Sequence, residues 1–224
     1  MTDYKIIQTI NGPEDVKKLS MEQLEELASE IREALFNRLT KIGGHFGPNF
    51  GMVEAEIAMH YVFSSPKDKF VFDVSHQSYP HKILTGRKDG FKNLRQYGGL
   101  SGFPKREESP CDAYDTGHSS TSISAGVGYV CASKVSGEEY HVVSVIGDGA
   151  LTGGMAYEAL NNAASLNKNF VIVLNDNKMS ISENVGGISS YLSNLRTAES
   201  YTDLKSEVKK TLNKVPGIGP VMVQ

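Results

Sequence analysis

The sequence has no long hydrophobic run: nowhere among its 224 residues is there an apolar stretch of about 18 residues, the length that a transmembrane helix needs. Its N-terminus, MTDYKIIQTINGPEDVKKL, lacks the apolar core of a signal peptide. Cysteine is scarce, since only Cys111 and Cys131 occur, and two are too few for a disulfide framework. We therefore expect a soluble protein of the reducing cytoplasm, with no membrane among its partners.

An excess of positive charge is also missing. The chain carries 23 Lys and Arg against 26 Asp and Glu, a net charge of −3, so we expect no basic surface for nucleic acid. Internal repeats and low-complexity segments do not occur. The apolar fraction of 39% and the charged fraction of 22% are typical of a globular protein. The length allows one large domain or two small ones.

Two common phosphate-binding motifs are absent. No Gly-Lys-Ser or Gly-Lys-Thr occurs, which excludes a Walker loop. The glycine-rich stretch that begins at Gly147 fails the G-x-G-x-x-G pattern, because its last position is Thr152. A phosphate site in this chain would therefore need another design.

A long amphipathic helix is predicted near the N-terminus. Ser20 and Gln23 form the pattern of a capping box, and Gly43 with Gly44 is a suitable end. Between them, apolar residues recur at helical spacing opposite a face of glutamates. A glycine-rich loop, GGHFGPNFG (43–51), and a second predicted helix over 51–63 follow.

Three apolar runs predict strands over 70–74, 141–146 and 170–174. A helix predicted over 155–166 connects the last two, which makes a βαβ unit with parallel strands and a right-handed crossover. Continuous apolar runs are typical of strands that are covered on both faces. We therefore expect an α/β fold class, a mostly parallel sheet flanked by helices.

The remaining segments are predicted as loops and helices. SHQSYPHK (75–82) follows the first strand as a loop. DTGHSSTSISAG (115–126) is predicted to be a loop that enters a helix of small residues. The tail contains an amphipathic pattern over 202–213 and a short apolar segment, VMV, at 221–223.

Each of the last two predicted strands ends in a polar triplet, GDG at 147–149 and NDN at 175–177. Ligands of an open parallel sheet bind outside the carboxyl ends of its strands. Asp148 and Asn177 offer the oxygen ligands that Mg²⁺ prefers, and the glycines let the backbone approach a phosphate. A magnesium-bridged diphosphate is the simplest ligand for these parts. The alternative is that both triplets serve only as turns, which explains either one alone better than it explains the pair.

Longer blocks of the sequence resemble those of a known enzyme family. They are DVSHQSYPHKILTGR (73–87), LRQYGGLSGFPKR (94–106), TGHSSTSISAG (116–126), VIGDGALTGGMAYEALNNA (145–163) and VLNDNKMSISENVG (173–186). The GDG and NDN pair is similar to the thiamine diphosphate signature of transketolase-like enzymes, and the blocks are similar to the 1-deoxy-D-xylulose-5-phosphate synthase family. The resemblance implies a thiamine diphosphate-binding fold. It also implies a transferase of isoprene and thiamine biosynthesis that condenses pyruvate with glyceraldehyde 3-phosphate and releases CO₂.

The resemblance also implies roles for single residues. Asp148 and Asn177 would hold Mg²⁺ through their side chains, and Met179 through its main-chain carbonyl. His45 and His76 would be catalytic and would face the thiazolium and the substrate, where imidazoles can relay protons near neutral pH. The cofactor itself would supply the electron sink. The implied cofactor-binding set is His76, Gly117, His118, Ser119, Gly149, Ala150 and Asn177.

The other histidines and one basic pair have simpler interpretations. We expect His60 to be a packed core residue or a helix-surface residue, and His141 to be exposed. His81 is an intermediate case, because Pro80-His81-Lys82 could simply close a loop. Lys105 and Arg106 could meet a substrate phosphate, but a solvated pair is the more ordinary arrangement.

The chain departs from the family pattern near both histidines of interest. Pro48 stands where the family usually has a small hydroxyl residue, and Phe50 stands where leucine is usual. Pro48 stiffens the loop and removes a backbone donor. Ser75 replaces the usual glycine before His76, which can shift that loop or add a hydroxyl.

Only the first domain of the family is matched. We expect residues 1–224 to be an N-terminal domain that binds diphosphate and Mg²⁺, shortened at its end and without the pyrimidine-binding and C-terminal domains. The glutamate that activates the aminopyrimidine belongs to the next domain, so the chain alone should bind the cofactor weakly and be inactive. It could be a fragment, a shortened chain or one subunit of a split enzyme. The alternatives are a non-catalytic cofactor-binding or assembly subunit and a transketolase-type N-terminal subunit that needs a partner chain. By resemblance we expect a homodimer.

Overall fold

The computed structural model describes residues 4–166, 169–177, 187, 191 and 194. The chain divides into two units, Met1–Asn177 and Lys178–Gln224, and every element below belongs to the first. The helix predicted over 202–213 and the apolar segment at 221–223 lie outside the described residues. Among the helices that the structure describes, none has the length and apolar character to cross a membrane.

The N-terminal part is helical and follows the predicted pattern. Helix α3 (Met21–Ile42) begins with the expected capping box: Ser20 Oγ accepts the N–H of Gln23 at 3.3 Å, and the Gln23 side chain accepts the N–H of Ser20 at 2.9 Å. The buried face of α3 packs into an apolar core with α1, α5 and the segment around Leu84. The other elements here are α1 (Lys5–Thr9), α2 (Pro13–Val16), α4 (Gly47–Phe50) and α5 (Val53–Val62).

Three strands form a parallel sheet in the order β1-β2-β3. They are β1 (Lys69–Phe72), β2 (Val142–Gly147) and β3 (Phe170–Asn175). The α/β prediction is confirmed, but the first strand ends two residues early, because Val74 and Ser75 turn the chain with φ values of 56° and 74°. β1 and β2 are covered on both faces as expected, whereas β3 keeps Val171 and Leu174 exposed.

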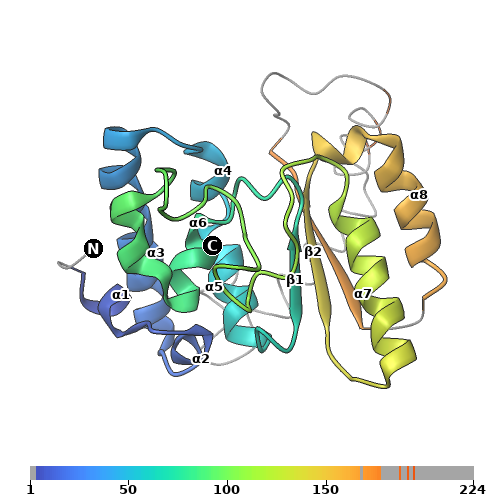
Figure 1. Cartoon of the computed structure of the whole chain (residues 1–224), viewed down its shortest axis with the longest axis horizontal. Coiled ribbons are helices and arrows are strands. Elements are labelled where there is room, and N and C mark those ends of the chain that lie inside the picture. Colours follow the sequence, from blue (N-terminus) through green and yellow to red (C-terminus); the bar gives the residue numbers. More distant parts are fainter. Residues whose placement is uncertain (1–3, 167–168, 178–186, 188–190, 192–193, 195–224) are drawn as a thin grey trace. The chain divides into compact units, whose positions relative to one another are not determined.

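Helices cover both faces of the sheet (Figure 1). Helices α7 (Ser122–Ser136) and α8 (Gly154–Ala163) lie on one side, and α5 packs on the other side through Met59 against Phe70 and Val143. Contact between α7 and the sheet is close at Gly126, where an added Cβ would lie 2.4 Å from Ser144 Oγ. This packing places the carboxyl ends of all three strands at one edge.

Two predicted loops contain helical turns. The 43–51 loop includes α4, with Pro48 in its first turn, where a missing N–H costs no intrahelical bond. In SHQSYPHK, the loop prediction is wrong from Tyr79 onward. Pro80 again lies in a first helical turn and starts a helical run instead of interrupting one. The run consists of α6 (Tyr79–Lys82), a π-type turn (Ile83–Arg87) and a 3₁₀ helix (Lys88–Asn93).

Candidate functional site

The GDG and NDN triplets lie at neighbouring strand ends. Gly147 at the end of β2 pairs in register with Asn175 at the end of β3, and the N–H of Asp148 donates to the carbonyl of Asn175 at 3.2 Å. Asp148 is buried, whereas Asn177 is exposed. Met179, the third residue expected at the metal, lies outside the described residues. The sheet therefore brings one carboxylate and one amide to the same edge.

The turn after β2 carries the residues expected at the diphosphate. Gly149 and Ala150 are half-buried, and a short 3₁₀ helix (Ala150–Thr152) leads into the N-terminus of α8. Backbone N–H groups and the helix dipole at such a terminus favour an anion. The phosphate contact expected at this turn stays a prediction, with which the position of the α8 N-terminus is compatible.

Asp73, at the end of β1, connects this turn to the loop at 116–121. Its carboxylate is buried and accepts the N–H groups of Ser120 at 2.7 Å and Ser122 at 2.9 Å. Ser120 Oγ in turn donates to the carbonyl of Ala150 at 2.7 Å. The loop at 116–121 and the turn after β2 touch so closely that an added Cβ on Gly153 would lie 2.2 Å from Ser120 Oγ. Gly117, His118 and Ser119 form the exposed part of this loop, beside the strand ends.

His45 and His76 lie side by side although they come from different loops. Their ring centroids are 5.3 Å apart with the planes at 77°, and the Phe103 ring lies 6.2 Å from His45. The Nδ1 atoms of both histidines are buried and have no hydrogen-bond partner among the described residues. Each ring therefore keeps one buried nitrogen atom that the described residues leave unsatisfied.

The surroundings keep both imidazoles neutral. Burial lowers the pKa of His45, and the positive charge of Arg95 lowers it further. Burial also lowers the pKa of His76; the charge of His45 adds to this effect, and Asp73 opposes it. At neutral pH both rings can therefore accept a proton, which is what a proton relay requires.

Comparison with known proteins identifies the family. A family profile described as 1-deoxy-D-xylulose-5-phosphate synthase matches residues 7–224. The chain belongs to the 1-deoxy-D-xylulose-5-phosphate synthase family. Family membership implies the use of thiamine diphosphate.

Relatives of this family match the chain over nearly its whole length. It is 56% identical to the 1-deoxy-D-xylulose-5-phosphate synthase of Carboxydothermus hydrogenoformans over 219 residues, which is 98% of this chain and 35% of that protein. The identity to the enzyme of Syntrophomonas wolfei is 56% over 216 residues, or 96% of this chain and 34% of the relative. The identity to 1-deoxy-D-xylulose-5-phosphate synthase 1 of Geobacter sulfurreducens is 54%, over 98% of this chain and 34% of the relative. The chain thus spans about 35% of the length of these curated relatives.

The departure from the family pattern at Ser75 fits the backbone. The residue has a φ of 74°, in the left-handed region where glycine is favoured. Its Oγ donates to the carbonyl of Phe72 at 2.7 Å, a local hydrogen bond that a glycine cannot make. The turn before His76 therefore keeps the conformation that glycine would adopt.

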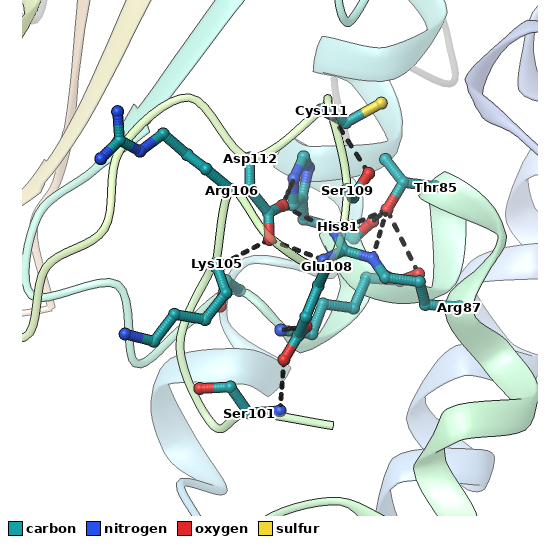
Figure 2. A network of polar contacts seen from close by, with 12 residues as sticks. His81, Thr85, Arg87, Ser101, Lys105, Arg106, Glu108, Ser109, Cys111 and Asp112 are labelled. Carbon is teal, nitrogen blue, oxygen red and sulfur yellow. Dashed lines mark hydrogen bonds and ion pairs between the residues drawn. The ribbon is translucent and has the colours of Figure 1, made fainter. Parts of the chain in front are cut away.

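The other histidine pair, His60 and His81, belongs to a buried charged network (Figure 2). His81 Nε2 is 3.0 Å from Asp112 Oδ1, and its Nδ1 is 2.9 Å from His60 Nε2. Arg87 donates to both carboxylate oxygens of Asp112, at 2.6 and 2.7 Å. Because Asp112 can only accept, the proton of neutral His81 lies on Nε2 and Nδ1 accepts from His60. His60 is packed as predicted, but His81 is buried in a helix and does not simply close a loop.

The charges of this network decide which groups are ionised. Burial alone would raise the pKa of Asp112, but hydrogen bonds from His81 and Arg87 outweigh it and hold that pKa well below its usual range. Burial lowers the pKa values of His60 and His81. The network therefore contains an ionised Asp112–Arg87 pair beside two neutral imidazoles.

The same network anchors the loop at 101–112. The N–H of Lys105 donates to Asp112 Oδ2, and the N–H of Ser101 donates to Glu108, both at 2.7 Å. The side chains of Lys105 and Arg106 point away from the network and are exposed (Figure 2), as expected of a solvated pair. His141 is half-exposed, also as expected, and lies 3.3 Å from Asp68.

Glu56→Gln is predicted to stabilise the fold at high pH. Glu56 is fully buried and accepts the N–H of His81, yet burial raises its pKa well above 4.5. A group of this kind contributes stability below pH 4.5 that is lost as the pH rises toward its folded-state pKa. We expect the glutamine variant to gain about 1–3 kcal/mol in the free energy of unfolding near pH 8, and less toward pH 4.5, as measured by urea denaturation.

Glu54→Gln, on the same helix, is the matched control. The hydrogen bond from Arg32 lowers the pKa of Glu54, so its contribution is present above pH 4.5 and is lost in acid. Its replacement should therefore destabilise the protein at high pH. A Glu56→Gln effect that does not change between pH 5 and 8 would contradict a protonated Glu56.

Sequence reasoning did not identify several residues of this site. Asp73 follows an apolar run directly, a signal that was available and resembles that of Asp148. Arg95 and Phe103 lie in a family block, but nothing in the block shows that they face His45. Asn49 lies in the glycine-rich loop at 43–51, where no pattern of the sequence indicates its contacts with other loops. Among the residues that the structure describes, no group of three or more His, Cys, Asp or Glu side chains is arranged to hold a metal ion.

Proposed function

We propose that this chain is the thiamine diphosphate- and Mg²⁺-binding domain of a carboligase. The reaction is the condensation of pyruvate with glyceraldehyde 3-phosphate to 1-deoxy-D-xylulose 5-phosphate and CO₂. The observation that carries the proposal is one sheet edge with Asp148 and Asn177 at neighbouring strand ends and a neutral histidine pair at the same domain's loops. Family membership supports the assignment.

The residues at this sheet edge fit Mg²⁺ and thiamine diphosphate. Asp148 supplies a buried carboxylate and Asn177 an amide oxygen, a donor set suited to Mg²⁺. Met179 would add its main-chain carbonyl, and water and the diphosphate would complete the shell. Gly149 and Ala150 would lie against the diphosphate, and Gly117, His118 and Ser119 would border the cofactor. His45 and His76 are both partly exposed, so their rings would be able to contact a bound cofactor or substrate.

Within this arrangement the protein orients groups and moves protons. Thiamine diphosphate supplies the electron sink when bound. His45 and His76, being neutral, would accept or return a proton at a ring nitrogen. Asp73 would keep the loop at 117–119 against the turn at Gly149.

Turnover is proposed to need more than residues 1–224. Because the chain spans about 35% of its relatives, we assign it the diphosphate-binding half of the site and place the glutamate that activates the aminopyrimidine in a pyrimidine-binding domain. That domain and the C-terminal domain would be supplied by the same protein or by a partner chain. A homodimer is the expected assembly. Two free cysteines, one of them exposed, support the cytoplasm as the compartment.

Calorimetric titration of the 224-residue chain with thiamine diphosphate tests the proposal. We expect weak binding in Mg²⁺, none in excess EDTA, and no CO₂ from pyruvate. Absence of binding in Mg²⁺ would contradict the cofactor assignment, and equal binding in EDTA would contradict the metal bridge. Pyruvate decarboxylation by this chain alone would contradict the division of labour between domains.

A further inference from the structure

The Asn49 side chain joins the backbones of both candidate catalytic histidines. Its Nδ2 donates to the carbonyl of His45 at 2.7 Å and to the carbonyl of His76 at 2.9 Å. Its Oδ1 accepts the N–H of Tyr79 at 2.8 Å. Two carbonyls and one N–H can be satisfied by only one orientation of the amide. Asn49 is fully buried, so these bonds do not compete with water.

Both histidines are carried by irregular backbone. Gly43 and Gly44, with φ values of 74° and 145°, lead to His45, and Val74 and Ser75, both with positive φ, lead to His76. Regular helix or strand hydrogen bonds do not fix such segments. A single amide that bonds both of them therefore sets how far apart they lie.

We propose that Asn49 is a positioning residue that fixes the spacing and mutual orientation of His45 and His76. The two rings consequently act as one pair, 5.3 Å between centroids and nearly perpendicular. The catalytic meaning of the pair rests on the proposed function, whereas its geometry is a property of this chain alone. No other buried side chain in the described part of the chain is shown bonding both histidine backbones.

The pair can be observed through its electrostatic coupling. The charged or titratable groups that influence it are Arg95 near His45 and Asp73 near His76. Because a charge on His45 lowers the pKa of His76, His45→Asn should raise the His76 pKa measured by NMR from the ring Cε1 proton. The His45→Asn replacement is then introduced into a second background, the Asn49→Leu variant, and the His76 pKa is measured again. Leucine is a neutral replacement of similar size to asparagine.

We expect the response of His76 to His45→Asn to disappear in the Asn49→Leu background. It should persist in Asn37→Leu, a replacement of an exposed asparagine on α3. A folded Asn49→Leu protein that keeps the full response would overturn the proposal, because Asn49 would then be only structural. Neither result depends on cofactor binding, so the calorimetric test of the proposed function stands apart from this one.

A second measurement uses the wild-type chain and does not require the variant to fold. Both Nδ2 protons of Asn49 should exchange with solvent at least ~10-fold more slowly than those of Asn37, because both are hydrogen-bonded and buried. Equal exchange rates for the two side chains would refute the bridging contact.

Discussion

Replacing Asp112 with alanine is expected to lower the free energy of unfolding by about 3–5 kcal/mol, the cost of removing one partner from a buried ion pair. Arg87 would keep its charge in a site where its side chain is only 10% exposed. His81 would lose its acceptor, and the N–H of Lys105 would lose its bond to the carboxylate. Urea denaturation at pH 7 measures the change.

Asp115→Ala is the matched control for this experiment. Asp115 pairs at 3.5 Å with Arg106, whose side chain is 68% exposed, and exposed pairs contribute about 1 kcal/mol or less. Equal losses for the two variants would mean that Asp112 is not the centre of the network.

The same residue predicts a pH dependence. The pKa of Asp112 lies below its ordinary value of 3.8. The contribution of Asp112 to stability is therefore present above about pH 4 and is lost as the pH falls from there toward the lowered pKa. The stability of Asp112→Ala should therefore fall less steeply in acid than that of the wild type.

Asp148→Ala is expected to weaken the Mg²⁺-dependent binding of thiamine diphosphate by at least ~100-fold, or about 2.8 kcal/mol. The variant removes the only anionic side chain proposed at the metal, and the remaining amide and carbonyl ligands do not replace its charge. The backbone bond from Asp148 to Asn175 does not involve the side chain, so the sheet should remain intact. Calorimetry gives the affinity, and circular dichroism checks the fold.

Asp89→Ala is the control for charge, since it removes an exposed carboxylate from the 3₁₀ helix (Lys88–Asn93). It should bind thiamine diphosphate like the wild type. Equal affinities for Asp148→Ala and the wild type would remove Asp148 from the metal site and leave the turn interpretation of GDG.

The βαβ core could be predicted from sequence because its signals are local. Apolar runs predicted the strands and helical spacing predicted α3. The helix predicted over 155–166 made the last two strands a parallel βαβ unit, with GDG and NDN at the same end of the sheet. The short helices α4 and α6 could not be predicted in this way. Each has only four residues, one of them a proline, and tertiary contacts such as that of Asn49 with Tyr79 hold them in place.

The candidate site, too, could be predicted only in part from local sequence patterns, as the histidine pair shows. His45 and His76 entered the prediction through family blocks, because no local pattern states which way a loop side chain points. Partners such as Asp112 for His81 or Ser120 for Asp73 are distant in the chain. Only the folded arrangement shows that β1 ends before Asp73, which the sequence analysis placed inside the predicted strand, and that Asp73 holds a loop.

The contact between Ser120 and Gly153 has a consequence for how this site can evolve. Each segment fills the space that the other would need for a larger residue. A mutation that enlarges position 153 becomes acceptable only after a reduction at position 120, a position whose backbone already suits glycine with a φ of 66°. In a genetic selection for altered cofactor specificity, the two loops should therefore yield paired changes, with suppressors of one mapping to the other.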